Sequence, residues 1–292
     1  MEIPAGATDV HVHIQPWAQL LPPVAAAMTA GRRDLDQVER FQGDPAAFLA
    51  WLDTQGVYRV GLVNYPAPTI MGFDQSTNDF VAAYRDRCPE RFLAWGGLDP
   101  SLVPDAGKEV ERLLFELRLD GLKVHPPHQG FAPNAYLDGL DALRTLYRLC
   151  QEHQVPVMVH TGTSVFPGAR SRLGDPMLCD DVAVDFPELR LVLAHCGRPL
   201  WYEEAFFVAR RHRNVWVDLS GIPPRQIPER LPRIEMLADK VLWGTDWPSP
   251  GVRNMRANLD EFLALPGLSS EFKRKVLVDN PLRLFPGSRA KS

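Results

Sequence analysis

The sequence predicts one α/β domain over residues 1–292, a single (β/α)8 barrel of the TIM type. Short runs of apolar and β-branched residues occur eight times along the chain, and longer stretches with helical spacing lie between them. The runs are mostly continuous rather than alternating, which is typical of parallel strands covered on both faces. An open doubly wound sheet is the alternative, but the glycine-rich phosphate turn of such sheets does not follow the first run.

The expected strands are these apolar runs, namely residues 9–14, 57–65, 92–98, 121–125, 155–160, 189–195, 215–219 and 241–245. The first expected helix begins at Asp44 and Pro45, because an N-cap residue and a proline at the first helical position favour a helix start. Its last residue precedes Gly56. The other expected helices are 76–87 (or 77–87), 104–119, 137–153, 176–186, 200–211, 226–238, a segment around Phe262, and 270–279.

Long segments follow four of the expected strands, and we expect them to be loops. They are residues 15–43, 66–75, 126–136 and 162–175. In a (β/α)8 barrel the segments after the strands lie at the C-terminal face, where active sites are built. The sequence therefore predicts a functional site at that face.

The composition excludes several classes of protein. The chain carries 32 Lys and Arg against 36 Asp and Glu, so its charge gives no reason to expect nucleic acid or an anionic membrane as a partner. The four cysteines lie far apart, which argues against a zinc ribbon or a disulfide scaffold and favours a reducing compartment. No signal peptide or membrane-spanning run is apparent, so we expect a cytoplasmic protein.

Histidine and aspartate side chains stand where several of the expected strands end. His11 and His13 share one face of the first strand, roughly 6–7 Å apart along it, so both imidazoles reach one ion if that face is the barrel interior. His160 and Asp246, at the ends of the fifth and eighth strands, complete a candidate set of metal ligands. This donor set suits one divalent ion, with Zn²⁺ expected first and Mn²⁺ or Fe²⁺ as alternatives.

A single histidine at a strand end is more often a polar residue hydrogen-bonded near the surface than a metal ligand. Several such ends in one barrel, one of them with His-x-His spacing, favour a shared metal site over coincidence.

The motifs together resemble the amidohydrolase superfamily, and more narrowly its amidohydrolase-related branch, which includes pyrone-dicarboxylate lactonase and aminocarboxymuconate-semialdehyde decarboxylase. The resemblance runs from the first strand to the eighth and is carried by Asp9-Val10-His11-Val12-His13, Gly121-Leu122-Lys123-Val124-His125-Pro126, Val159-His160-Thr161-Gly162, Ala194-His195-Cys196-Gly197 and Gly244-Thr245-Asp246-Trp247-Pro248. It implies that His11, His13, His160 and Asp246 bind the metal. It also implies that His195 is an acid/base catalyst and that Asp246 handles the proton of the attacking water.

The resemblance leaves two interpretations of Lys123. Some members of the superfamily carbamylate a lysine on the fourth strand to bridge two metals, and only then is a second ion expected here. We favour an unmodified Lys123 that binds a substrate carboxylate or an internal acid. The expected substrate-binding residues are Lys123, His125, Arg170, Arg172 and Trp247, although loop arginines are commonly solvated and tryptophans commonly pack under loops.

These observations favour a metal-dependent hydrolase that uses metal-activated water on a lactone, ester or amide carbonyl of a small, cyclic, carboxylated substrate. The same residues also suit non-oxidative decarboxylation of an aromatic or muconate-type acid. A third hypothesis, from another class, is a non-catalytic barrel that binds a ligand. The expected partner is a small molecule, and the resemblance also allows a homodimer.

Overall fold

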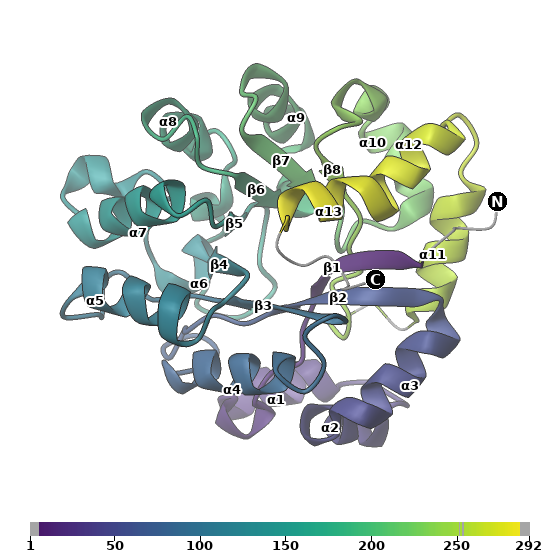
Figure 1. Ribbon diagram of the computed structural model, residues 1–292, viewed down its shortest axis with the longest axis horizontal. Coiled ribbons are helices and arrows are strands. Elements are labelled where there is room, and N and C mark those ends of the chain that lie inside the picture. Colours follow the sequence, from purple (N-terminus) through teal and green to yellow (C-terminus); the bar gives the residue numbers. More distant parts are fainter. Residues whose placement is uncertain (1–5, 251, 253, 287–292) are drawn as a thin grey trace.

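The computed structural model describes residues 6–250, 252 and 254–286, and its centre is an eight-stranded parallel sheet. Its strands follow one another in sequence order, and each pairs in parallel with the next (Figure 1). They are β1 (Ala7–Val12), β2 (Val57–Val63), β3 (Phe92–Gly96), β4 (Gly121–Val124), β5 (Val157–His160), β6 (Leu191–Ala194), β7 (Val215–Asp218) and β8 (Val241–Leu242). All eight predicted strands are present, and the predicted fold class is confirmed.

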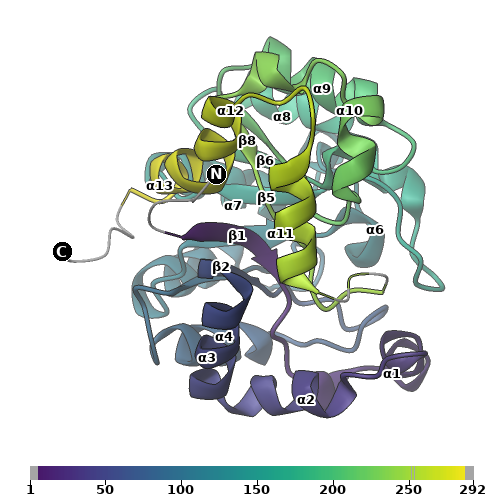
Figure 2. The same ribbon diagram turned by 90° about the vertical axis from the view of Figure 1, so that its right-hand side faces the viewer.

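Helices surround this sheet on its outer side (Figures 1 and 2). They are α1 (Pro22–Thr29), α2 (Leu35–Gly43), α3 (Pro45–Gln55), α4 (Ser76–Arg85), α5 (Ala106–Glu111), α6 (Pro126–Gln129), α7 (Asp141–Glu152), α8 (Leu178–Asp185), α9 (Tyr202–Arg211), α10 (Ile227–Arg230), α11 (Met255–Ala264), α12 (Ser270–Arg274) and α13 (Asn280–Leu284). In the described ranges we find no helix with the length and apolar character needed to cross a membrane.

Helix α3 has the bounds that its capping residues predict. The Asp44 side chain accepts a hydrogen bond from the backbone N–H of Ala47 at 2.9 Å, and Pro45 occupies the first helical position. Gly56 follows the helix in the left-handed conformation, with φ of 70°, which glycine adopts without strain.

Three predicted segments differ from the structure. Residues 126–136, expected to be a loop, begin with the short helix α6, whose first positions are prolines, which favour a helix start. Residues 15–43, expected to be a loop, contain α1 and α2; α2 buries Val38 and Phe41 on one face, and this amphipathic pattern explains its formation. The helix expected over 226–238 is broken into α10 and a 3-10 turn, Ile234–Leu237. Pro228 and Pro232 lie inside that segment, and a proline in a helix interior removes a backbone donor and clashes with the preceding turn.

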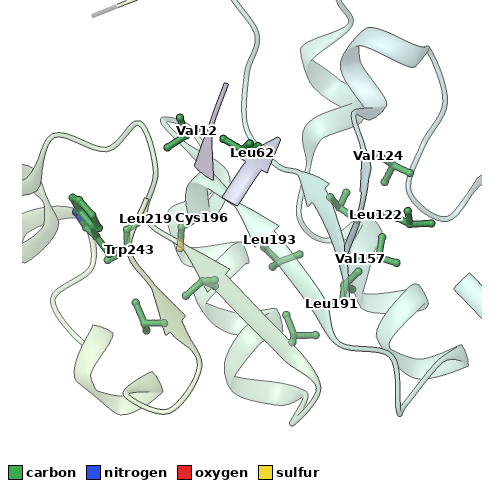
Figure 3. Close-up of a cluster of buried hydrophobic side chains, with 14 of the residues drawn as sticks. Val12, Leu62, Leu122, Val124, Val157, Leu191, Leu193, Cys196, Leu219 and Trp243 are labelled. Carbon is green, nitrogen blue, oxygen red and sulfur yellow. The ribbon is translucent and has the colours of Figure 1, made fainter. Parts of the chain in front are cut away.

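The alternation of side chains along the strands separates an apolar outer layer from the barrel interior. Outward residues such as Leu122, Val124 and Leu193 join the buried cluster that packs the sheet against the helices, as Figure 3 shows. A second buried cluster includes inward residues of several strands, among them Trp95, and the ring of Phe285 meets that of Trp95 edge to face. The barrel is therefore a filled core whose polar inward residues gather toward the strand ends.

The first and last strands meet along a seam, which we define as the contacts between residues 9–13 and 243–247. The backbone N–H groups of Val10, His13 and Asp246 donate across it to the carbonyls of Trp243, Trp247 and His11. The buried carboxylate of Asp9 strengthens the seam, because it accepts hydrogen bonds from the backbone N–H of His11 and from the N–H and hydroxyl of Thr245. The seam fixes β1 against the segment after β8.

We predict that Asp44→Ala lowers the free energy of unfolding by about 1 kcal/mol, because an N-terminal N–H of α3 loses its acceptor. Urea unfolding followed by circular dichroism measures this change. Glu39→Ala, at an exposed position on α2, is the matched control and should stay within about 0.5 kcal/mol of the wild type. Equal stability of the Asp44 variant and the control would contradict the capping role.

Candidate active site

The seam brings His11, His13 and Asp246 together at the C-terminal ends of β1 and β8. The Nε2 atom of His13 lies 3.0 Å from Oδ1 of Asp246, and the Nε2 atom of His11 lies 3.8 Å from the same oxygen. Asp246 has a left-handed backbone, with φ of 67°, and its N–H is bonded to the His11 carbonyl at 2.9 Å. A non-glycine residue held in this conformation is strained, and such strain is common at functional sites.

The hydrogen bonds of His13 show which of its ring nitrogens faces Asp246 as an acceptor. Its Nδ1 lies 2.9 Å from the carbonyl oxygen of Val63, and because a carbonyl only accepts, Nδ1 carries the proton. In the neutral ring Nε2 then presents a lone pair to the Asp246 carboxylate. Two acceptors at this separation repel each other unless a proton or a metal cation lies between them.

His11 is oriented in the same way by groups on β7 and just after it. Its Nδ1 lies 2.6 Å from Oδ2 of Asp218 and 3.0 Å from the hydroxyl of Ser220, which itself donates to Asp218. Its Nε2 is buried without a hydrogen-bond partner among the described residues. A carboxylate that holds the far nitrogen of a histidine is a common arrangement behind metal ligands, since it fixes the tautomer and increases the basicity of the free nitrogen.

His195 follows β6 and is also held through Nδ1. That nitrogen lies 3.0 Å from the carbonyl oxygen of Ser220, so Nε2 carries the lone pair. His195 and Cys196 both have positive φ, 63° and 46°, which turns the chain sharply at the end of the strand. Burial, together with nearby His160 and Arg198, lowers the pKa of His195 well below its usual value, so the ring is a neutral proton acceptor at pH 7.

The donors fit a single metal ion. One ligand atom each from His11, His195 and Asp246 lies within 4.8 Å of the other two, and His13 contacts Asp246 from the side. Burial alone would raise the pKa of Asp246, but the adjacent His13 and His11, together with Arg198, keep that pKa below its usual value. Neutral imidazoles and an ionised carboxylate are the donors that divalent transition metals take.

His160 lies beside His195, which belongs to this group of donors. Its ring centroid lies 4.7 Å from that of His195, and its buried Nε2 has no hydrogen-bond partner among the described residues. Its role as a ligand stays a prediction. His125 stacks on the other side of His160 at 3.8 Å, and His128 stacks on His125 at 3.5 Å.

The site opens into a cavity of about 320 Å³ at the mouth of the barrel. Its walls include both strand-end residues and loop residues: His11, His13, Gln15, Met28, Tyr65, Met71, Lys123, His125, His128, His160, Thr163, Ser164, Val165, Phe166, His195, Arg198, Pro199, Asp246, Ser249 and Pro250. A volume of this size suits one small ring with substituents.

The predicted substrate-binding residues divide between the cavity and other places. Lys123 and His125 line the cavity, and burial lowers the pKa of Lys123 to about 7. Its Nζ has no hydrogen-bond partner among the described residues, and carbamylation of this nitrogen stays a prediction. Arg170 and Arg172 are exposed and lie outside the cavity lining.

Trp247 does not line the cavity, in contrast to the prediction. It is fully buried and packs against Trp51 and Phe48, with ring centroids 4.9 and 5.9 Å apart. The physical reason is the alternation of side chains: Asp246 faces the cavity, so the next residue points outward to the helices.

Three residues of the site were not predicted. Asp218 and Ser220 orient His11, and the signal for Asp218 was an acidic residue in the otherwise apolar run of β7. Arg198 lines the cavity with Nη2 3.9 Å from Oδ2 of Asp246, and it donates to the carbonyl of Gly221 at 2.7 Å. The sequence feature that could have identified Arg198 was its position directly after the His195-Cys196-Gly197 motif.

Comparisons with known proteins agree with this geometry. A sequence model of the amidohydrolase family matches residues 8–287. The 2-pyrone-4,6-dicarboxylate hydrolase of Comamonas testosteroni is 32% identical over 161 residues, which cover 40% of this chain and 51% of that protein. The chain thus spans about half the length of that relative.

Two further relatives align over more of their length. The 4-sulfomuconolactone hydrolase of Rhizobium radiobacter is 25% identical over 97% of this chain and 91% of its own. The gamma-resorcylate decarboxylase of Rhizobium sp. (strain MTP-10005) is 25% identical over 71% of this chain and 74% of its own. Among solved structures, a manganese-bound dihydroxybenzoic acid decarboxylase from Polaromonas sp. JS666 has the same fold, with a TM-score of 0.70, 18% identity and 98% of each chain covered.

We predict that His11→Ala and Asp246→Ala each lose the bound divalent ion, because each removes one of the three proposed donors at the seam, His11, His13 and Asp246. Elemental analysis of protein purified without chelator measures the metal content per chain. His153→Ala, at an exposed position after α7, is the control and should keep the full content. Full metal content in both site variants would show that these residues do not hold the ion.

We also predict that Asp218→Asn weakens metal binding roughly 10–100-fold, because His11 loses its charged hydrogen-bond acceptor. Competition with a chromophoric chelator measures the affinity, and thermal unfolding of the metal-free protein checks that the barrel remains intact. An unchanged affinity in a folded variant would remove Asp218 from the metal site.

Proposed function

The chain belongs to the amidohydrolase family, and on that premise we propose that it is a metal-dependent hydrolase of a small, cyclic, carboxylated substrate. The observation that carries the proposal is the contact between His13 and Asp246. Nε2 of His13 and Oδ1 of Asp246 face each other at 3.0 Å beside the cavity while a backbone carbonyl holds Nδ1 of the same ring, an arrangement that a divalent cation between the two atoms would stabilise. We propose zinc as that cation, with manganese or iron as alternatives and a second ion only if Lys123 is carbamylated.

The residues around the cavity have the properties that hydrolysis needs. A divalent ion at such a site polarises a carbonyl and lowers the pKa of a bound water to about 7. Asp246 accepts a proton from the attacking water, and the water oxygen forms a bond to the carbonyl carbon. His195, neutral at pH 7, exchanges protons in the same reaction, and a proton reaches the leaving oxygen or nitrogen as its bond to the carbonyl carbon breaks.

The charges of the cavity support an anionic substrate. Arg198, which only donates, and Lys123, which does so in its ammonium form, line it, and Asp246 is the acidic side chain among the lining residues. Two of the relatives are named for lactones, a pyrone dicarboxylate and a sulfomuconolactone. We therefore propose a lactone ring that carries a carboxylate as the preferred substrate class, ahead of linear esters and amides.

Decarboxylation is the second candidate, and the similarity to a gamma-resorcylate decarboxylase supports it. The same donors would orient a substrate carboxylate, and His195 would deliver a proton to the ring carbon as carbon dioxide leaves. The hydrolase is preferred because the Comamonas relative is 32% identical whereas the decarboxylase is 25% identical.

We predict ring opening without release of carbon dioxide when the metal-loaded protein meets a panel of carboxylated lactones and aromatic acids. Loss of lactone absorbance follows the first reaction, and a coupled carbon dioxide assay follows the second. Carbon dioxide release alone would replace the hydrolase with the decarboxylase. Metal binding without turnover of any panel member would favour the ligand-binding barrel.

We predict that His195→Asn lowers kcat by roughly 100-fold or more while the metal content stays that of the wild type, since general acid–base groups contribute about 10²–10⁴ in rate. Steady-state kinetics on the best panel substrate and elemental analysis of the same sample are the two measurements. Loss of the metal in this variant would instead make His195 a ligand. Full turnover would remove it from the reaction.

A further inference from the structure

A chain of hydrogen bonds on the cavity wall is not used by the proposed hydrolysis. It joins Tyr65, which follows β2, to His128 on α6 and to Ser164, which follows β5. The hydroxyl of Tyr65 lies 3.0 Å from Nδ1 of His128, and Nε2 of His128 lies 2.8 Å from the hydroxyl of Ser164. All three residues line the cavity, so the chain ends where a substrate would lie.

The imidazole of His128 is held rigidly between its two partners. It stacks on His125 with ring centroids 3.5 Å apart and planes inclined by 14°. The side chain of Gln129 anchors the short helix below it, because it donates to the carbonyls of Pro66 and Leu98 and accepts from the N–H of His125. The ring therefore keeps its orientation without a substrate.

The three residues donate in one order, from Tyr65 to His128 and from His128 to Ser164. Burial, followed by the nearby charge of Lys123, lowers the pKa of His128 to about 3, so its ring is neutral and carries one proton. Within the described residues, the Tyr65 hydroxyl bonds to His128 and to no other group, and Tyr65 is buried. If His128 donated from Nδ1, the phenolic proton would have no acceptor among the described residues, which is costly for a side chain that is only 3% exposed. Tyr65 therefore donates to Nδ1, and Nε2–H donates to Ser164.

This direction decides what Ser164 offers to the cavity. Its hydroxyl oxygen accepts from Nε2–H of His128 and from the backbone N–H of Phe166 at 3.2 Å, which fills both lone pairs. Its own proton is then free to be donated. Ser171 fixes the backbone of the loop, because its hydroxyl accepts from the N–H of Ser164 at 3.2 Å.

We propose that Ser164 donates a hydrogen bond to a carboxylate oxygen of the substrate, and that His128 and Tyr65 are positioning residues that orient its proton. The substrate class rests on the proposed function. Arg198, which only donates, and the ammonium form of Lys123 line the same cavity and favour a carboxylate over a neutral acceptor. Ser164 thus selects for the acid substituent of the ring and takes no part in the bond that breaks.

The test uses isophthalate, a planar ring dicarboxylate that cannot be hydrolysed, and calorimetric titration into the metal-loaded protein. Ser164→Ala should weaken its binding roughly tenfold, as expected for one hydrogen bond to a charged group, and Ser164→Thr should restore most of the loss. Tyr147→Phe, which removes a buried phenol that donates to Pro133 away from the cavity, is the control and should bind as the wild type does. Unchanged binding by Ser164→Ala, or no binding by the wild type at millimolar isophthalate, would overturn the proposal.

The positioning role of His128 and Tyr65 can be measured separately, through the location of the His128 ring proton. Nitrogen NMR of the histidine rings, with the His128 signals assigned by comparison with His128→Gln, should show the proton on Nε2 in the wild type. In Tyr65→Phe the proton should redistribute toward Nδ1, and isophthalate should bind more weakly. A proton on Nδ1 in the wild type would contradict the direction of the chain.

Failure of this proposal is distinguishable from failure of the proposed function, because the binding test needs no turnover. Ring opening with equal KM and equal isophthalate affinity in the wild type and in Ser164→Ala would leave the hydrolase intact and remove the role of Ser164. The expected binding pattern without turnover of any lactone would support the subsite and remove the hydrolase.

Discussion

The seam between β1 and the segment after β8 is the constraint on which the site depends. The last strand must return beside the first to close the barrel, and the N–H of Asp246 bonds to the carbonyl of His11 where it does so. Asp9 joins the two segments through its buried carboxylate, which accepts two hydrogen bonds from Thr245 and a third from the N–H of His11 in its own segment. Barrel closure therefore brings two imidazoles and a carboxylate from opposite ends of the sequence together at the mouth of the barrel.

The polar groups of the site are satisfied away from the cavity and unsatisfied toward it. Nδ1 of His11, His13 and His195 is bonded to the protein, whereas the buried atoms Nε2 of His11 and Nζ of Lys123 have no partner in the described part of the chain. Unpaired buried groups cost about 1–3 kcal/mol each. Of the five non-glycine residues described with positive φ, His195, Cys196 and Asp246 lie here. The site thus gathers buried groups without partners and strained backbone, whose cost the proposed ion and the proposed anionic substrate would reduce.

The residues whose positions follow from strand periodicity could be predicted from the sequence. His11, His13, His195 and Asp246 stand at strand ends, so alternation and topology suffice to bring them together. Asp218 could not be identified from the sequence, because its role depends on its contact with the His11 ring. The three-dimensional placement of the strands decides that contact, and strand periodicity alone does not give it. The positions of loop residues were harder to predict. Arg170 and Arg172 are exposed, and the arginine that lies beside Asp246 is Arg198. Trp247 was assigned to the wrong face, although the same alternation would have placed it outward.

We propose that barrel closure creates one metal centre from His11, His13 and Asp246. Anomalous diffraction from crystals of the protein purified with its native metal, recorded on both sides of the metal's absorption edge, would locate the ion. We expect one peak at about 2.0–2.2 Å from Nε2 of both histidines and from the Asp246 carboxylate. A metal peak at another place, with direct His13–Asp246 contact retained, would contradict it.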